Sequence, residues 1–164
     1  MAIIDFFDRG WRINPAGTAY IQDERSYGFD EVGELSCRIA NGLLALGFPK
    51  ETKGAVWAVN DVTAWTCTLG LWRANMCWIP VGARNPADEN CHLLDAFDCE
   101  VLFFQKCFAP VIAGIRQQLP QVKLWICIDD ELPDFPGTHS LTNWVKDQPA
   151  TPPNVPVDLD DVVM

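Results

Sequence analysis

The sequence predicts an α/β fold of three layers, in which helices cover both faces of a mostly parallel sheet and a β-hairpin precedes the sheet. Two observations lead to this prediction. Four short apolar runs (55–59, 77–81, 101–104 and 123–128) begin 22, 24 and 22 residues apart, and a helix-like segment separates each run from the next. Strands that alternate with helices in this way form right-handed βαβ units. The runs are apolar on both faces, as expected for a sheet covered on both sides.

The first third of the chain predicts a helix, a hairpin and a longer helix. Residues 3–10 have an amphipathic helical pattern, and residues 19–22 and 26–29 flank a polar turn that predicts the hairpin. Asp30 is suited to cap the next helix, whose apolar residues recur at helical spacing to Leu46. Gly47 then ends that helix.

Three helix-like segments lie between the predicted strands, at about 62–73, 86–97 and 108–118, and Pro86 marks the start of the second. After residue 130 the pattern loosens, with one helical turn expected at 142–147. We therefore divide the chain into an α/β unit (1–147) and a proline-rich connector (148–164). The connector ends in an apolar run that resembles the start of another strand, so we expect the chain to continue past Met164.

Composition limits the class of protein. Of the 164 residues, 49% are hydrophobic and 21% are charged, which is typical of a globular domain with a substantial core. The net charge is −10 and the Lys and Arg residues form no basic run, which argues against a nucleic-acid partner.

The sequence predicts a cytoplasmic protein. Acidic Asp5 follows the N-terminus too closely for a secretory signal, and Arg73 interrupts the longest uncharged apolar stretch well short of a membrane span. The seven cysteines are odd in number, form no C-x-x-C pair and lie mostly in apolar runs, so we expect small buried residues rather than disulfides or a zinc site.

Two groups of residues at predicted strand ends are candidates for binding. Asn60 and Asp61 follow the first parallel strand, at the edge where open α/β folds bind ligands. A helix cap by Asp61 is the favoured interpretation, with ligand binding as the alternative. Arg84 follows the second strand in an otherwise anionic chain.

Other candidates for chemistry have simpler structural explanations. Cys91 and His92, with Asp95 one turn later, are adjacent on a helix and should point in different directions, so we expect no nucleophile–base pair. His139 is expected in a polar loop. The acidic run 129–131 is a candidate Mg²⁺ ligand at a strand end, although a solvated turn is favoured. Neither G-x-G-x-x-G nor G-x-x-x-x-G-K-[ST] occurs, so no nucleotide-phosphate loop is predicted within the chain.

Two segments resemble the opening of the adenylate-forming superfamily, the acyl-CoA synthetases and ligases. Residues 24–47, ERSYGFDEVGELSCRIANGLLALG, match its tyrosine–aromatic–acidic start and the helix that follows. Residues 54–82, GAVWAVNDVTAWTCTLGLWRANMCWIPVG, match its Asn, Leu-Gly and Pro positions at residues 60, 69–70 and 80. The resemblance extends over about residues 1–130.

The resemblance implies the N-terminal part of an ATP-dependent acyl- or aryl-CoA synthetase, inactive without the remainder of its own polypeptide. Such enzymes use ATP, Mg²⁺ and coenzyme A to convert a small carboxylic acid into an acyl-adenylate and then a thioester. In some of them an Arg after the second strand contacts the CoA nucleotide phosphate. Arg84 occupies that position, although Gly82-Ala83 replace the usual Asn-Pro before it. The alternative is a self-contained flavodoxin- or receiver-like binding module with its ligand near Asn60 and Asp61.

Overall fold

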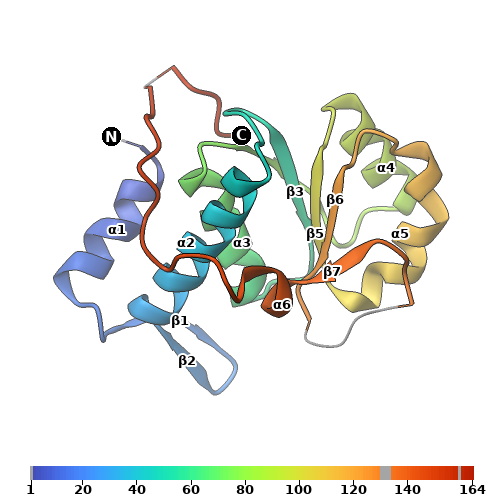
Figure 1. Ribbon diagram of the computed structural model, residues 1–164. Helices are drawn as coiled ribbons and strands as arrows, with labels where there is room; N and C mark the ends of the chain where they lie inside the picture. The colour runs from blue at the N-terminus through green and yellow to red at the C-terminus, as the bar shows by residue number, and fades with distance from the viewer. Residues whose placement is uncertain (1, 130–133, 159) are drawn as a thin grey trace.

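The computed structural model describes residues 2–129, 134–158 and 160–164 and confirms the predicted α/β class. Its β-hairpin precedes a five-stranded parallel sheet in the order β4-β3-β5-β6-β7 (Figure 1). The helices and strands, in chain order, are α1 (Ile4–Ile13), β1 (Thr18–Gln22), β2 (Arg25–Gly28), α2 (Phe29–Ala45), β3 (Lys53–Trp57), α3 (Val62–Arg73), β4 (Cys77–Pro80), α4 (Ala87–Ala96), β5 (Val101–Phe104), α5 (Ala109–Ile115), β6 (Leu124–Cys127), β7 (Thr138–Ser140) and α6 (Leu141–Val145).

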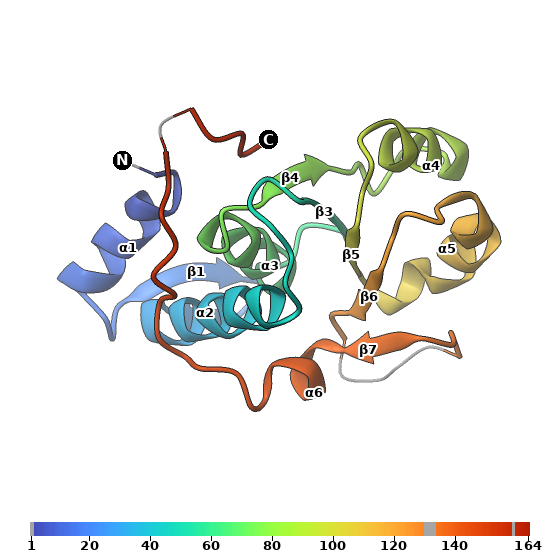
Figure 2. The same ribbon diagram turned by 45° about the horizontal axis from the view of Figure 1, so that its top comes forward.

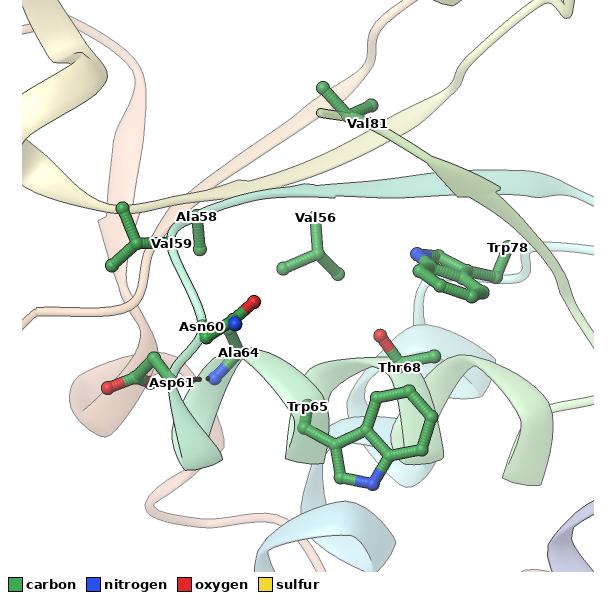
Figure 3. A pocket seen from close by; sticks show the side chains of 10 residues that line it. All are labelled: Val56, Ala58, Val59, Asn60, Asp61, Ala64, Trp65, Thr68, Trp78 and Val81. Atoms are coloured by element: carbon green, nitrogen blue, oxygen red, sulfur yellow. Dashed lines mark hydrogen bonds between the residues drawn. The ribbon is translucent and has the colours of Figure 1, made fainter. Parts of the chain in front are cut away.

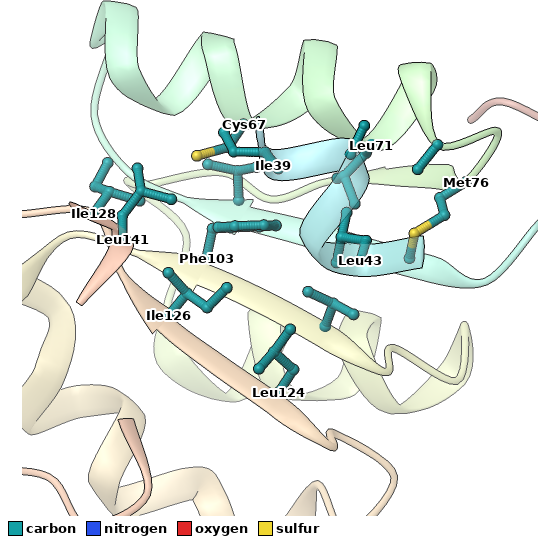
Figure 4. Packing of buried hydrophobic residues seen from close by; sticks show 14 of the residues in the cluster. Ile39, Leu43, Cys67, Leu71, Met76, Phe103, Leu124, Ile126, Ile128 and Leu141 are labelled. Atoms are coloured by element: carbon teal, nitrogen blue, oxygen red, sulfur yellow. The ribbon is translucent and has the colours of Figure 1, made fainter. Parts of the chain in front are cut away.

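Helices cover both faces of the sheet, as the doubly apolar strands predict (Figure 2). Alternate residues of each strand point to opposite faces, so Phe103 and Ile126 pack with α2, α3 and α6, as Figure 4 shows. Leu102 and Trp125 pack on the other face with α4 and α5. The two cores therefore fix the positions of the strand ends that carry the candidate residues.

A partly buried ion pair attaches α1 to the outside of this sandwich. Arg73, the residue that interrupts the apolar run of α3, donates to both carboxylate oxygens of Asp8 on α1, at 3.0 and 2.6 Å. Its Nε also donates to Ser36 Oγ on α2 at 3.1 Å. The Arg73 side chain is only 3% exposed, so its charge depends on these partners.

Two local predictions are wrong. The helix expected to start at Asp30 starts at Phe29, and its N-cap is Gly28, without a side-chain cap. Asp30 instead accepts a hydrogen bond from Trp11 Nε1 at 2.7 Å. His139, expected in a polar loop, lies in the short strand β7, an element that the sequence did not reveal. Gly47, in contrast, ends the helix with a φ of +78°, which confirms its predicted role.

The chain after α6 returns across α2 toward the opposite edge of the sheet (Figure 1), and we call residues 146–164 the strap. Arg38 donates to the backbone carbonyls of Lys146 and Gln148, and Asn41 donates to those of Pro149 and Thr151. Further along, Asn75 donates to the carbonyl of Pro156 and to the carboxylate of Asp161. The strap is thus held by polar side chains along most of its course.

Candidate functional site

The candidate site lies at the carboxyl edge of the sheet, where β3, β4 and β5 end. The chain passes from β3 outward to β4 and then back across β3 to β5, so the direction of winding reverses between β3 and β5. Open α/β sheets bind ligands outside the carboxyl ends of their strands at such a reversal. Here Gln105, directly after β5, accepts a hydrogen bond from the Val59 N–H at 2.9 Å and joins the two loops.

Asp61 serves mainly as a helix cap, the interpretation favoured from the sequence. Its Oδ1 accepts a hydrogen bond from the Ala64 N–H at 2.9 Å, and Asp61 is the N-cap of α3. Gln22 of the hairpin accepts from the Val62 N–H at 2.8 Å and donates to Asp61 Oδ2 at 3.3 Å. The amides of Val62 and Ala64 in the first turn of α3 are therefore occupied, whereas the neighbouring side chain of Asn60 is exposed at the edge.

An apolar hollow of about 410 Å³ opens beside Asn60 (Figure 3). Val56 of β3 lines it, and so do the rings of Trp65 and Trp78. These two rings and that of Trp72 contact one another edge-on, with centroids 5.5 to 6.2 Å apart. Because aromatic pairs in this geometry are mutually favourable, the wall of the hollow is well fixed.

Arg84 lines a second hollow of about 610 Å³ next to the first. Asn60 and Val81 are among the residues that line both hollows. The loop that carries Arg84 is held by Asn90, a fully buried residue of α4 that donates to the Gly82 carbonyl at 2.9 Å. Sequence reasoning missed Asn90, although a polar residue at an inward-facing helical position is a recognisable signal. Arg84 itself is exposed, so its guanidinium is available to an anion.

In the acidic run after β6, Asp129 has a structural role. Asp129 accepts a hydrogen bond from the Lys106 N–H in the turn after β5. Residues 130 and 131 of the predicted run lie outside the described residues. Within the part of the chain that the structure describes, no three His, Cys, Asp or Glu side chains are grouped so that they could hold a metal ion.

The structure does not bring Cys91 and His92 together as a catalytic pair. Cys91 is buried and its Sγ contacts Gln118 Oε1 at 3.8 Å, whereas His92 is exposed. Burial is the largest cause that raises the pKa of the Cys91 thiol, and the nearby carboxylates of Asp95 and Asp88 act in the same direction. A thiol with a raised pKa is a poor nucleophile at neutral pH, so Cys91 is not suited to nucleophilic catalysis. None of the seven cysteines forms a disulfide.

These features define an open α/β domain with a candidate binding edge, where an apolar hollow and the exposed Arg84 lie, without a grouped set of catalytic side chains in the described residues. No helix among those residues is long and apolar enough to cross a bilayer. Comparison with known families specifies the class further. The chain belongs to the family of AMP-binding enzymes, whose model matches residues 7–164.

Curated relatives of this chain include CoA ligases. It is 28% identical over 130 residues to the 4-hydroxybenzoate–CoA/benzoate–CoA ligase of Rhodopseudomonas palustris. The aligned region covers 79% of this chain and 24% of that ligase. The chain is 29% identical over 126 residues to the crotonobetaine/carnitine–CoA ligase of Escherichia fergusonii, covering 76% and 24%. The chain therefore spans about a quarter of the length of these relatives.

Solved structures show the same fold. The anthranilate CoA ligase AuaEII, in complex with anthranoyl-AMP, superimposes with a TM-score of 0.85 at 20% identity, over 92% of this chain and 29% of that one. The N-terminal domain of FACL13 from Mycobacterium tuberculosis superimposes with a TM-score of 0.84 at 24% identity, over 98% and 40%. The fold is that of a part of such ligases, which agrees with the resemblance stated from the sequence.

Proposed function

We propose that this chain is the N-terminal part of a cytoplasmic, ATP-dependent acyl- or aryl-CoA synthetase. The observation that carries the proposal is the match of the AMP-binding enzyme family to residues 7–164. The names of the relatives, which are CoA ligases acting on benzoate or carnitine-type acids, support the reaction class. The same match favours a ligase over the self-contained binding module considered from the sequence.

The reaction of such a ligase has two steps. A carboxylate oxygen attacks the α-phosphorus of ATP and releases pyrophosphate, which gives an acyl-adenylate. The thiol of coenzyme A then attacks the acyl carbon, and AMP leaves. The first step needs cationic groups around the phosphate oxygens, which in this superfamily are Mg²⁺ and a lysine.

The residues present do not fit an ATP–Mg²⁺ site. The sequence has no glycine-rich phosphate loop of either common type, and the described residues offer no group of three metal ligands. We therefore assign the adenylation chemistry to the remainder of the polypeptide and propose that the 164-residue chain is inactive alone. Its role in the proposal is to form one wall of the ligand cleft.

Arg84 is the residue of this chain proposed to contact a cofactor. Its guanidinium is exposed at the carboxyl edge and lines the second hollow, on a loop that Asn90 fixes to α4. A guanidinium binds a phosphate group through paired N–H donors. We propose that Arg84 binds a phosphate of the CoA nucleotide.

ATP–pyrophosphate exchange tests the proposed function. The full-length protein should exchange labelled pyrophosphate into ATP when supplied with a panel of small aromatic and aliphatic carboxylic acids, and the 164-residue chain should not. A full-length protein that exchanges with no acid in the panel, and forms no thioester, would contradict the proposal. Exchange by the 164-residue chain alone would contradict its dependence on the remainder.

Substitution of Arg84 tests the CoA contact separately. Arg84→Ala in the full-length protein should raise KM for CoA by about tenfold, the value of one charge-assisted contact, with little change in kcat. The adenylation half-reaction should be unchanged, because CoA takes no part in it. Arg9→Ala, at an exposed position on α1, is the matched control and should leave both unchanged. An unaltered KM for CoA in Arg84→Ala would remove Arg84 from the site.

A further inference from the structure

Helix α1 presents an apolar face to the outside of the molecule. Its inner side packs through Ile4, Phe7 and Trp11, whereas Phe6 and Ile13 on the opposite side are 69% and 73% exposed. Figures 1 and 2 show α1 at the outermost side of the molecule, with α2 and the strap behind it. Because the helix is fixed from its inner side, the two exposed side chains are presented in a defined arrangement.

The charges beside this face follow the same spacing as the apolar residues. Phe6 and Ile13 are seven residues apart (13−6), or two helical turns, so they lie on one face about 10 Å apart. Asp5 and Arg12 are also seven residues apart (12−5) and therefore lie together along one flank of that face. Asp5 Oδ2 accepts a hydrogen bond from the Ala2 N–H at 2.8 Å, and a carboxylate can accept several. Arg12 is exposed and makes no ion pair within the residues that the structure describes.

Such a face is complementary to a second copy of itself. A two-fold axis perpendicular to two antiparallel helices reverses their direction and keeps each flank on its own side. Phe6 of one copy then lies opposite Ile13 of the other, Asp5 lies opposite Arg12, and each contact occurs twice. The exposed Arg9 meets its own copy near the axis, and Asp5 of the other copy, one helical turn away, offsets that repulsion.

We propose that this outer face of α1, formed by Phe6 and Ile13 with Asp5 and Arg12 beside them, joins two copies of the protein in an antiparallel dimer. The net charge of −10 per copy opposes association only weakly, because salt screens charges more than about 8 Å apart at physiological ionic strength. The same net charge, with Asp5 on the flank, argues against an anionic membrane surface as the occupant. The face is small, so we expect a Kd on the order of 10 µM.

Analytical ultracentrifugation of the full-length protein over a range of concentrations tests the proposal. Phe6→Asp places a carboxylate in the apolar centre of the interface and should raise the Kd of the dimer at least about tenfold. Phe97→Asp is the matched control and should leave the Kd unchanged, because that ring is 54% exposed next to α4, on the other side of the sheet from α1 (Figure 1). A wild-type protein that is still monomeric at about 200 µM, or equal effects of the two substitutions, would overturn the inference.

Exchange of the flanking charges tests the antiparallel geometry. Asp5→Arg alone and Arg12→Glu alone each place like charges opposite one another, so each variant should have a Kd at least about tenfold higher than the wild type. In an equimolar mixture of the two variants, each cation again faces an anion, and a mixed dimer should form with a Kd near that of the wild type. A change in the stability of α1 would not be reversed by mixing. Failure of the mixture to recover dimers would therefore overturn the proposed pairing.

Vesicle binding distinguishes a membrane surface from a second copy as the occupant. Full-length protein at concentrations below the Kd of the dimer should not co-sediment with vesicles of phosphatidylcholine and phosphatidylserine. Co-sedimentation that Phe6→Asp abolishes would overturn the inference in favour of a membrane surface.

Discussion

Removal of Asp8 should destabilise the fold more than the loss of an ordinary surface charge. The Asp8→Ala substitution deletes both hydrogen bonds to the Arg73 guanidinium and leaves a cation that is 3% exposed without its counter-ion. Loss of one partner from a buried pair costs about 3–5 kcal/mol. Because the Asp8 side chain is 26% exposed, water can partly replace it, and we expect the lower end, about 3 kcal/mol.

Thermal and urea unfolding of the 164-residue chain measure this effect. For a domain of this size, 1 kcal/mol corresponds to about 2–4 °C in Tm, so Asp8→Ala should lower Tm by about 6–12 °C. The matched control is Glu31→Ala, which breaks a surface ion pair with Arg25 whose side chains are 46% and 64% exposed. That substitution should cost less than about 1 kcal/mol.

A double substitution checks the physical reason. Arg73→Met in the Asp8→Ala background replaces the stranded cation by an apolar side chain of similar length, and it should recover part of the lost stability. If Asp8→Ala lowers Tm no more than Glu31→Ala, or if the second substitution causes a further full loss, the buried-charge argument is refuted.

Three more predictions concern packing, thiols and pH. Gly70→Ala places a β-carbon 2.5 Å from a side-chain carbon of α2 and should lower the free energy of unfolding in urea by about 1–3 kcal/mol. Gly114→Ala places its β-carbon in open space and should be neutral or stabilising. Equal effects of the two substitutions would contradict the close approach of α2 and α3. A thiol reagent should modify only the exposed Cys107 in the native chain, whereas it should modify all seven cysteines after unfolding. Rapid modification of a second thiol in the native chain would contradict the burial of the other six. Hydrogen bonding from Lys50 is the largest cause that lowers the pKa of Asp161 to about 2, below its unfolded value, so this carboxylate stabilises the fold above about pH 4. The difference in Tm between the wild type and Asp161→Asn should therefore be constant near neutral pH and shrink as pH falls from about 4 toward 2, and a pH-independent difference would contradict it.

The layers of the fold were predictable because they depend on local patterns. The spacing of the apolar runs identified β3 to β6, and their doubly apolar character placed helices on both faces. Strand β7 was missed because its three residues, Thr138–Ser140, are polar or half-exposed and carry no alternation. The start of α2 was misplaced because a side chain distant in sequence, that of Trp11, occupies the carboxylate of Asp30.

The candidate site was predictable only in part. Parallel strands end at one edge, so the sequence could place Asn60 and Arg84 each at a strand end, and the structure shows that both line the second hollow. The hollow lined by Trp65 and Trp78 depends on contacts between α3 and β4, which no local pattern encodes. The Arg73–Asp8 pair joins residues 65 apart in sequence, and Arg73 looked only like an interruption of an apolar run.

The contacts that hold the first part of the strap have a consequence for how its sequence can vary. Arg38 and Asn41 on α2 donate only to backbone carbonyls there, including that of Pro149, and every residue type supplies a carbonyl. Proline lacks an N–H but keeps this acceptor, so a proline-rich strap loses nothing at these points. Substitutions within residues 146–151 should therefore be tolerated far better than substitutions of Arg38 or Asn41, and the information that positions the strap resides in α2.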